Sequence, residues 1–200
     1  MPMVWDNPRQ GIAIFANGAY RVRPLPAAAE VPKYAIPVEV TGPINFQLIA
    51  VWSKGGQDSP YVEGVVRAVE IYRDLFAQRR TVLAGDLNSN AIWDSSHAAG
   101  HNHSALVEML SELGLVSSYH FFHREAHGAE RQPTYYFQWK ESRPYHIDYC
   151  FIPAEWAPNV PCVEVGAYAE WKDRSYHRRL LVQLAGDSAT GTRPTPVASA

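Results

Sequence analysis

Short apolar runs, separated by polar and turn-forming residues, recur along most of the chain and predict many strands and few helices. Before residue 55, these runs indicate strands at 11–16, 34–40 and 44–52. The first run is almost wholly apolar, which is typical of a strand buried on both faces. The second contains Pro37, which favours an edge strand or a bulge because proline has no N–H to donate.

Helical spacing appears in two segments. The first follows Ser59 and Pro60, which suit the N-cap and the first helical position. Its apolar positions recur three and four residues apart and form one stripe, made of Val62, Val65, Val66, Val69, Tyr72 and Phe76. The second helix is predicted to be capped by Ser104 and to stop at Gly114, with Leu106, Met109, Leu110 and Leu113 on one face.

The remaining apolar segments are rich in aromatic and β-branched residues, which favour strands. We expect these strands at 81–84, 116–123, 134–139, 145–152, 162–168 and 177–184. The predicted class is α/β, with two packed, mostly antiparallel β-sheets flanked by helices in one domain over residues 1–185. Residues 186–200 have no periodicity and almost no large apolar side chains, which predicts a disordered tail.

The overall composition excludes some classes of protein. Hydrophobic residues are 46% and charged residues 19%, so the chain as a whole is not disordered. A net charge of -2 argues against a protein that coats long duplexes, but not against an enzyme that contacts a few phosphates. Cys150 and Cys162 are expected to be free thiols. With no apolar span and no secretory signal in view, we expect a cytoplasmic protein with no membrane contact and no evident protein partner.

Three short segments carry polar residues that are candidates for chemistry. Asp86, in Gly85-Asp-Leu-Asn88, could accept a proton from an attacking water, and Asn88 could orient that water or a phosphoryl oxygen. Taken alone, the same Asp-x-Asn is more often an ordinary Asx turn. Asp148 lies within an apolar strand, where a carboxylate needs a partner. If His177 begins a neighbouring strand, Asp148 could fix its tautomer, although each residue alone is more often structural.

Taken in order, Gly85-Asp-Leu-Asn88, His146-Ile-Asp-Tyr149 and Ser175-Tyr-His177 resemble the motifs of the endonuclease/exonuclease/phosphatase family, whose folds are similar to pancreatic deoxyribonuclease. The resemblance covers nearly everything from residue 5 to 184. It implies a four-layer α/β sandwich and a phosphoester hydrolase that uses Mg²⁺ or Mn²⁺ on nucleic acid or a small phosphoester. It implies further that Asp86 activates water, Asn88 positions it or the phosphate, His177 stabilises the phosphoryl transition state and Asp148 orients His177.

The sequence departs from this family pattern at two places. The family domain opens with a strand carrying Asn and a strand ending in a metal-binding Glu, and neither is seen here, so we expect a domain that is incomplete at the N-terminus. Tyr176 stands where the family has an acidic residue. Asp86 remains as a metal ligand, and Asp173 could supply a second carboxylate. The alternative function is a catalytically impaired remnant that binds phosphate-bearing ligands without turnover.

Other residues suggest weaker hypotheses. Trp93, in the loop after the Gly85 motif, and Arg178, next to His177, are candidates for substrate binding. Another class of function would be an unrelated zinc hydrolase built on His97, His101 and His103. Their spacing matches no zinc signature, so a polar loop before a capped helix explains these histidines more simply.

Overall fold

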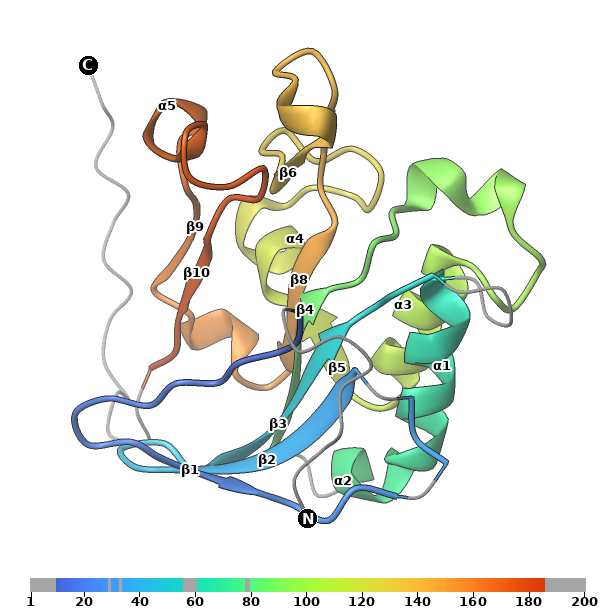
Figure 1. Cartoon of the computed structure of the whole chain (residues 1–200). Coiled ribbons are helices and arrows are strands. Elements are labelled where there is room, and N and C mark those ends of the chain that lie inside the picture. The colour runs from blue at the N-terminus through green and yellow to red at the C-terminus, as the bar shows by residue number, and fades with distance from the viewer. Residues whose placement is uncertain (1–9, 29, 33, 56–60, 78–79, 186–200) are drawn as a thin grey trace.

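The computed structural model describes residues 10–28, 30–32, 34–55, 61–77 and 80–185 (Figure 1). The strands are β1 (Arg21–Pro24), β2 (Ala35–Thr41), β3 (Phe46–Trp52), β4 (Thr81–Asp86), β5 (Leu115–Ser117), β6 (Tyr135–Tyr136), β7 (Pro144–Tyr145), β8 (Asp148–Pro153), β9 (Cys162–Val165) and β10 (Leu180–Gln183). The α-helices are α1 (Tyr61–Ile71), α2 (Arg73–Ala77), α3 (His103–Glu112), α4 (Ser118–His123) and α5 (Tyr168–Trp171). Short 3-10 helices are η1 (Ala91–Ser96), η2 (Phe137–Trp139) and η3 (Ala157–Asn159).

One large sheet organises the molecule, with the strand order β1-β2-β3-β4-β8-β5. Strands β3 and β4 run parallel, and the other neighbouring pairs in this sheet are antiparallel. Two small antiparallel sheets, β9–β10 and β6–β7, complete the β-structure of the described residues. The predicted mixed α/β class with mostly antiparallel sheets is therefore confirmed.

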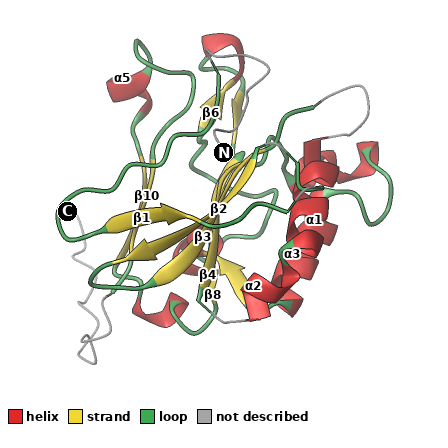
Figure 2. Ribbon diagram, turned by 60° about the horizontal axis from the view of Figure 1, so that its bottom comes forward, coloured by secondary structure: helices red, strands yellow, loops and turns green. Residues whose placement is uncertain are grey.

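The two faces of the large sheet pack against different layers. Helices α1, α2 and α3 lie together on one side of it, and β10 lies on the other (Figure 2). Leu83 and Phe151 point into the core beneath the helices, whereas Val82 and Ile152 point into a smaller core on the opposite face. Since side chains alternate along a strand, Asp86 at the end of β4 lies on the same face as Val82, away from the helices.

Two predicted strands are wrong. Residues 11–16 form no strand, and Phe15 is 92% exposed. The run is apolar, but no described strand lies beside it to complete a ladder of backbone hydrogen bonds. Residues 116–123 divide at Ser117 into the end of β5 and helix α4. Tyr119 and His120 are buried while Phe121 is exposed, so the tertiary environment overrides the strand propensity of these aromatic residues.

Smaller corrections concern the ends of elements. Helix α3 is capped by Asn102, whose side chain accepts a hydrogen bond from Ala105 N–H, and not by Ser104. The expected strand 134–139 shortens to β6, because Gln138 takes a left-handed conformation with φ 53°. Pro37 lies inside β2 and not on an edge strand of the sheet. Ser59, Pro60 and residues 186–200 lie outside the described residues.

Two further expectations can be compared with the described residues. Cys150 and Cys162 are both free, as expected. Among the helices of the described ranges, none is long and apolar enough to cross a membrane.

Gly85 allows β3 and β4 to approach closely just before Asp86. Its φ is +144°, and a Cβ atom built there would lie 1.8 Å from the carbonyl oxygen of Val51. An L-residue would therefore be strained and would also push the two strands apart. The glycine of the Gly85-Asp-Leu-Asn88 motif is needed by the backbone, independently of any chemistry.

We predict that Gly85→Ala lowers the free energy of unfolding by about 3 kcal/mol or more, since backbone strain and a steric clash add together. Gly100→Ala is the matched control. Gly100 also has a positive φ, of +80°, but its Cβ position is open, so only the conformational cost of about 1–2 kcal/mol applies. Urea unfolding followed by circular dichroism measures both variants. Equal losses of stability would show that the close approach at Gly85 is unimportant.

Candidate active site

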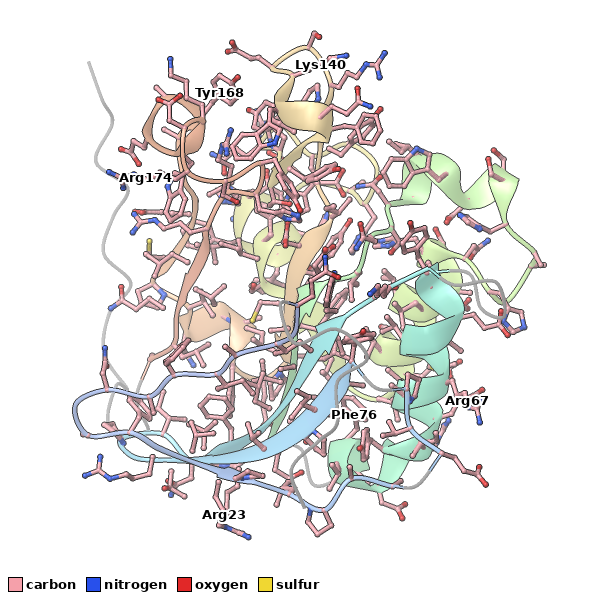
Figure 3. The ribbon with its side chains drawn as sticks, in the orientation of Figure 1. Arg23, Arg67, Phe76, Lys140, Tyr168 and Arg174 are labelled. Carbon is pink, nitrogen blue, oxygen red and sulfur yellow. The ribbon has the colours of Figure 1, made fainter. Side chains whose placement is uncertain are left out.

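Three segments that are distant in sequence meet at the end of the sheet toward which β4 runs. Asp86 ends β4, and Asp148, which begins β8, lies directly opposite it in the antiparallel register. His177 lies in the segment before β10, and a single antiparallel β-bridge to Tyr135 brings it to the same place. Lys140 and Tyr168 mark this end of the molecule in Figure 3, whereas Phe76 lies toward the other end.

The Asp148–His177 pair that the sequence predicts is present. His177 Nδ1 lies 2.9 Å from Asp148 Oδ2 and 3.2 Å from Oδ1, so the ring donates from Nδ1 to this carboxylate. The other ring nitrogen, Nε2, lies 4.0 Å from Asp86 Oδ2. The side chains of these three residues are between 15% and 27% exposed, so they are partly shielded but reachable from solvent. A carboxylate on Nδ1 fixes the tautomer and supports a proton on Nε2.

Asn88 holds the carboxylate of Asp86 in place. Its backbone N–H donates to Asp86 Oδ1 at 2.8 Å, and its side-chain Nδ2 donates to Asp86 Oδ2 at 2.8 Å. The same Nδ2 also donates to the carbonyl oxygen of Ser53, at the end of β3, at 2.8 Å. The Asx-type turn that the sequence allowed is therefore present, and it orients Asp86 as well as turning the chain.

The protonation states of the site depend on one another. Burial raises the pKa of Asp86, the neighbouring charge of Asp148 raises it further, and the hydrogen bonds from Asn88 only partly offset this, so it reaches about 7. Burial lowers the pKa of His177, but its hydrogen bond to Asp148 and the charges of both carboxylates outweigh burial and leave the pKa raised. Carboxylate oxygens of Asp86 and Asp148 lie within 4.8 Å of each other, and two negative charges this close need a proton or a cation between them.

Sequence reasoning missed Thr134, which joins the strands that carry the site. It is fully buried, and its Oγ1 accepts the backbone N–H groups of Ile147 and Asp148, both at 3.0 Å. Its carbonyl oxygen accepts the N–H of Arg178 at 2.6 Å. Thr134 therefore fixes the spacing between Asp148 and His177. A threonine in an otherwise aromatic strand after Pro133 was the available signal.

Arg178 is buried next to His177. It is 3% exposed, and its Nη1 donates to the carbonyl oxygens of Ser175 and His177, at 2.7 and 3.0 Å. Its guanidinium lies 4.5 Å from the ring centre of Tyr136. These contacts hold the segment that carries His177, and the role of Arg178 in substrate binding stays a prediction.

The two other predicted residues lie farther from the three central side chains. Trp93 packs its ring on Tyr145, 5.0 Å away, and Tyr145 pairs with Tyr135, whose ring lies 4.8 Å from His177. Trp93 is thus part of an aromatic wall beside the site. Asp173 is exposed and belongs to neither group of potential metal ligands in the described ranges.

The residues suited to hold a cation are Asp86, Asp148 and His177, whose ligand atoms lie within 4.8 Å of one another. Carboxylate oxygens are the ligands that Mg²⁺ and Mn²⁺ prefer, and Asp86 and Asp148 supply them. His97, His101 and His103 do not form a potential metal group within the described ranges, so the zinc hydrolase built on them is not supported.

We predict that Asp148→Asn lowers the pKa of His177, because it removes the hydrogen bond and the charge of Asp148 and leaves only the charge of Asp86 to oppose burial. NMR titration of the imidazole signals in chelator-treated protein measures this, with the other histidine signals as internal controls. Because the parent pKa is raised, the stability that protonated His177 contributes is lost as the pH rises through this pKa. An unchanged His177 pKa in Asp148→Asn would rule out the pairing.

No protein-family model and no curated protein matches this chain by sequence. Among solved structures, it is similar to the endonuclease domain of TRAS1, a telomere-specific non-LTR retrotransposon, with 17% identity and a TM-score of 0.53 over 80% of this chain and 64% of that one. It is also similar to the 3'-5' exonuclease NExo from Neisseria meningitidis, with 20% identity and a TM-score of 0.57 over 82% and 70% of the two chains. AP endonuclease LMAP from Leishmania major gives 13% identity and a TM-score of 0.55 over 82% and 60%.

The chain thus spans less than two thirds of the TRAS1 domain and of LMAP. At these identities the likeness concerns the fold, and it agrees with what the three sequence motifs imply. The chain has the endonuclease/exonuclease/phosphatase-type fold of these nucleases.

Proposed function

We propose that this chain is a metal-dependent phosphoester hydrolase that acts on nucleic acid. The observation that supports this best is the meeting of Asp86, Asp148 and His177 at one end of the sheet, with His177 bonded to Asp148 and facing Asp86. The similar structures include an endonuclease domain and a 3'-5' exonuclease, and NExo is also described as a 3' phosphatase bound to a product DNA hairpin. Hydrolysis of a phosphoester bond is common to these descriptions.

In this proposal Asp86 is the general base. It accepts a proton from the water whose oxygen attacks phosphorus, while the bond from phosphorus to the leaving oxygen breaks. The two hydrogen bonds from Asn88 hold the carboxylate in one orientation, which favours a single direction of proton transfer.

His177 stabilises negative charge on the phosphoryl oxygens. With Nδ1 donating to Asp148, Nε2 carries a proton that can be donated to an oxygen beside Asp86. The charge of Asp148 supports the protonated ring, so the donor is cationic when the phosphate carries most negative charge. Thr134 and Arg178 act as positioning residues because they hold the segments of Asp148 and His177.

The carboxylates of Asp86 and Asp148 would hold the cation. A bound Mg²⁺ or Mn²⁺ supplies Lewis-acid neutralisation of the phosphate charge. Positioning and charge neutralisation are the main demands of phosphoryl transfer, so this set of side chains suits the reaction.

Aromatic side chains beside His177 favour a substrate that carries bases. Tyr176 and Trp139 are 44% and 49% exposed, and their ring centres lie 5.4 Å apart. Tyr176 also packs against Tyr135, at 5.6 Å, and lies 5.0 Å from the ring of His177. Exposed aromatic rings stack on bases that are free of a duplex. We therefore propose single-stranded or unpaired segments as the preferred substrate.

We predict that Asp86→Asn lowers the turnover of a fluorescently labelled single-stranded oligonucleotide with Mg²⁺ or Mn²⁺ by about 100-fold or more, since it removes the general base. Asp173→Asn, at an exposed aspartate outside the site, should leave turnover unchanged and is the matched control. Circular dichroism confirms that both variants are folded. Full activity in Asp86→Asn would disprove the proposed mechanism. A parent protein that binds the oligonucleotide but never cleaves it would favour the impaired remnant.

We also predict that Trp139→Ala raises the KM for the single-stranded oligonucleotide by about 5-fold or more, because a stacked base contributes about 1–3 kcal/mol. The turnover number should change little, since Trp139 does not touch the residues that act on phosphorus. Phe122→Ala removes an exposed aromatic ring elsewhere and serves as control. A KM equal to that of the parent would exclude stacking at this position.

A further inference from the structure

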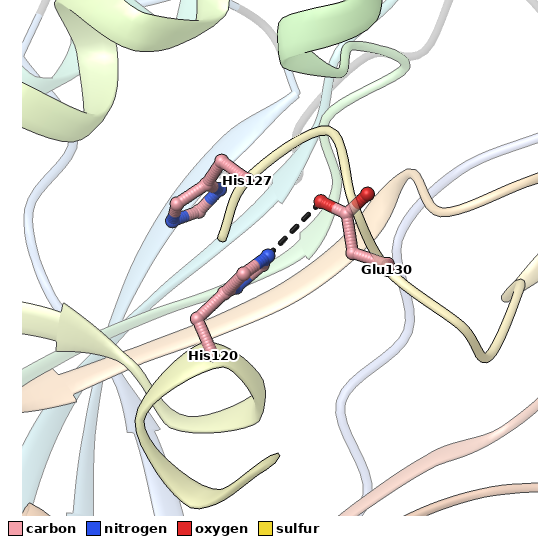
Figure 4. Close-up of side chains that lie close together, drawn as sticks. All are labelled: His120, His127 and Glu130. Carbon is pink, nitrogen blue, oxygen red and sulfur yellow. Dashed lines mark hydrogen bonds and ion pairs between the residues drawn. The ribbon is translucent and has the colours of Figure 1, made fainter. Parts of the chain in front are cut away.

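A second group of titratable side chains lies in the described residues on α4 and in the loop that follows it. His120 comes from α4, and His127 and Glu130 come from the loop (Figure 4). One possible ligand atom from each of these three residues lies within 4.8 Å of the other two. The side chains of His120 and Glu130 are only 8% and 4% exposed. This group shares no residue with Asp86, Asp148 and His177.

The side chains of the group already face one another. His120 Nε2 lies 2.9 Å from Glu130 Oε1, as the dashed line in Figure 4 marks. The rings of His120 and His127 stack with their centres 3.5 Å apart. Zn²⁺ bonds of about 2.0–2.1 Å place two tetrahedral ligand atoms about 3.3 Å apart. Because the lone pair of an imidazole nitrogen lies in the plane of its ring and the two ring planes are 15° apart, one ring must turn out of the stack for both to bind one ion.

Each of the three side chains also forms a hydrogen bond with a residue outside the group. His120 Nδ1 lies 2.7 Å from Ser117 Oγ, and His127 Nδ1 lies 3.0 Å from His103 Nε2. With a proton on Nδ1, His127 has Nε2 left for an ion, whereas His120 Nε2 is bonded to Glu130 and becomes free only when the proton between them leaves. The carboxylate of Glu130 receives hydrogen bonds from Gly128 N–H at 2.9 Å and Asn90 Nδ2 at 3.1 Å. Metal-binding histidines and carboxylates are commonly oriented by such partners.

The chemistry of the side chains also suits metal binding. The group combines two imidazoles with one carboxylate, and nitrogen and carboxylate oxygen are both ligands of Zn²⁺.

We propose that His120, His127 and Glu130 form a second metal site that takes Zn²⁺, separate from the site at Asp86. The proton between His120 Nε2 and Glu130 leaves to solvent when the ion binds, and water completes the coordination. His127 also lines an open depression beside Ser104, Val107 and Glu108, which gives the ion a route from solvent. The bound ion links α4 to the loop of residues 124–133.

Such a link would stabilise the loop behind the active site. Asn90, which follows Asp86 and Asn88 in the chain, donates to Glu130 and to the carbonyl oxygen of His146. His146 in turn lies two residues before Asp148. The ion would therefore hold together the segments that carry both catalytic carboxylates, without touching the substrate.

The test is titration of the full chain, after treatment with a chelator, with Zn²⁺ by calorimetry and with Co²⁺ by visible absorption. We expect one equivalent of Zn²⁺ that persists in Asp86→Asn, an upward shift of the melting temperature, and the intense Co²⁺ bands of a four-coordinate site. His127→Gln should weaken Zn²⁺ binding by about 10-fold or more, because it removes one ligand. His97→Gln with His101→Gln removes two histidines outside the group and should change nothing.

Zn²⁺ binding that is equally tight in the parent and in folded His127→Gln would overturn the proposal, as would a loss confined to the His97 and His101 variant. Absence of stoichiometric Zn²⁺ binding to the parent would also overturn it. If His127→Gln does not fold, the Co²⁺ spectrum of the parent decides, since a six-coordinate spectrum excludes the site. These readouts do not use hydrolysis, so they hold whether or not the proposed activity is found.

Discussion

The rest of the site depends on the close approach of two carboxylates, Asp86 and Asp148, across an antiparallel pair of strands. The register of β4 and β8 places Asp86 opposite Asp148 on one face of the sheet, where both are partly shielded from water. Like charges at that distance are unfavourable unless a proton or a cation offsets them. Burial, and then the charge of Asp148, raise the pKa of Asp86 to about 7, while the hydrogen bonds from Asn88 and the charge of His177 partly lower it. Because the fold keeps these two carboxylates close together, it favours the binding of a positive charge between them.

Several features with no chemistry of their own maintain that arrangement. Gly85 lets β4 pass close to β3 at the residue before Asp86. Thr134 ties the backbone of Asp148 to the segment after His177, and buried Arg178 holds that segment through two carbonyl oxygens. Backbone contacts and buried hydrogen bonds, distributed over several elements, therefore stabilise the close approach of the two carboxylates.

The sequence allowed the class of fold to be predicted from local patterns, and the central pair from three motifs whose order resembles that of a known family. Buried strands ending in polar motifs gave Asp86, Asn88, Asp148 and His177, and the structure brings these residues together. Helix α4 was missed because its aromatic residues favour strands when taken alone. Arg178 was predicted to bind substrate because it follows His177 in the sequence. Its burial against Tyr136 depends on tertiary packing, which the sequence alone does not show. The cluster of His120, His127 and Glu130 was missed because tertiary packing, and not a known spacing, creates it.

The most direct test of the account is anomalous diffraction from crystals of this chain grown with Mn²⁺. The account predicts an Mn²⁺ peak within about 2.5 Å of carboxylate oxygens of both Asp86 and Asp148. That peak should disappear in Asp86→Asn, while the bond between Asp148 and His177 stays in place. A fully ordered Asp86 and Asp148 with no Mn²⁺ between them, or with Mn²⁺ bound only elsewhere on the chain, would contradict it.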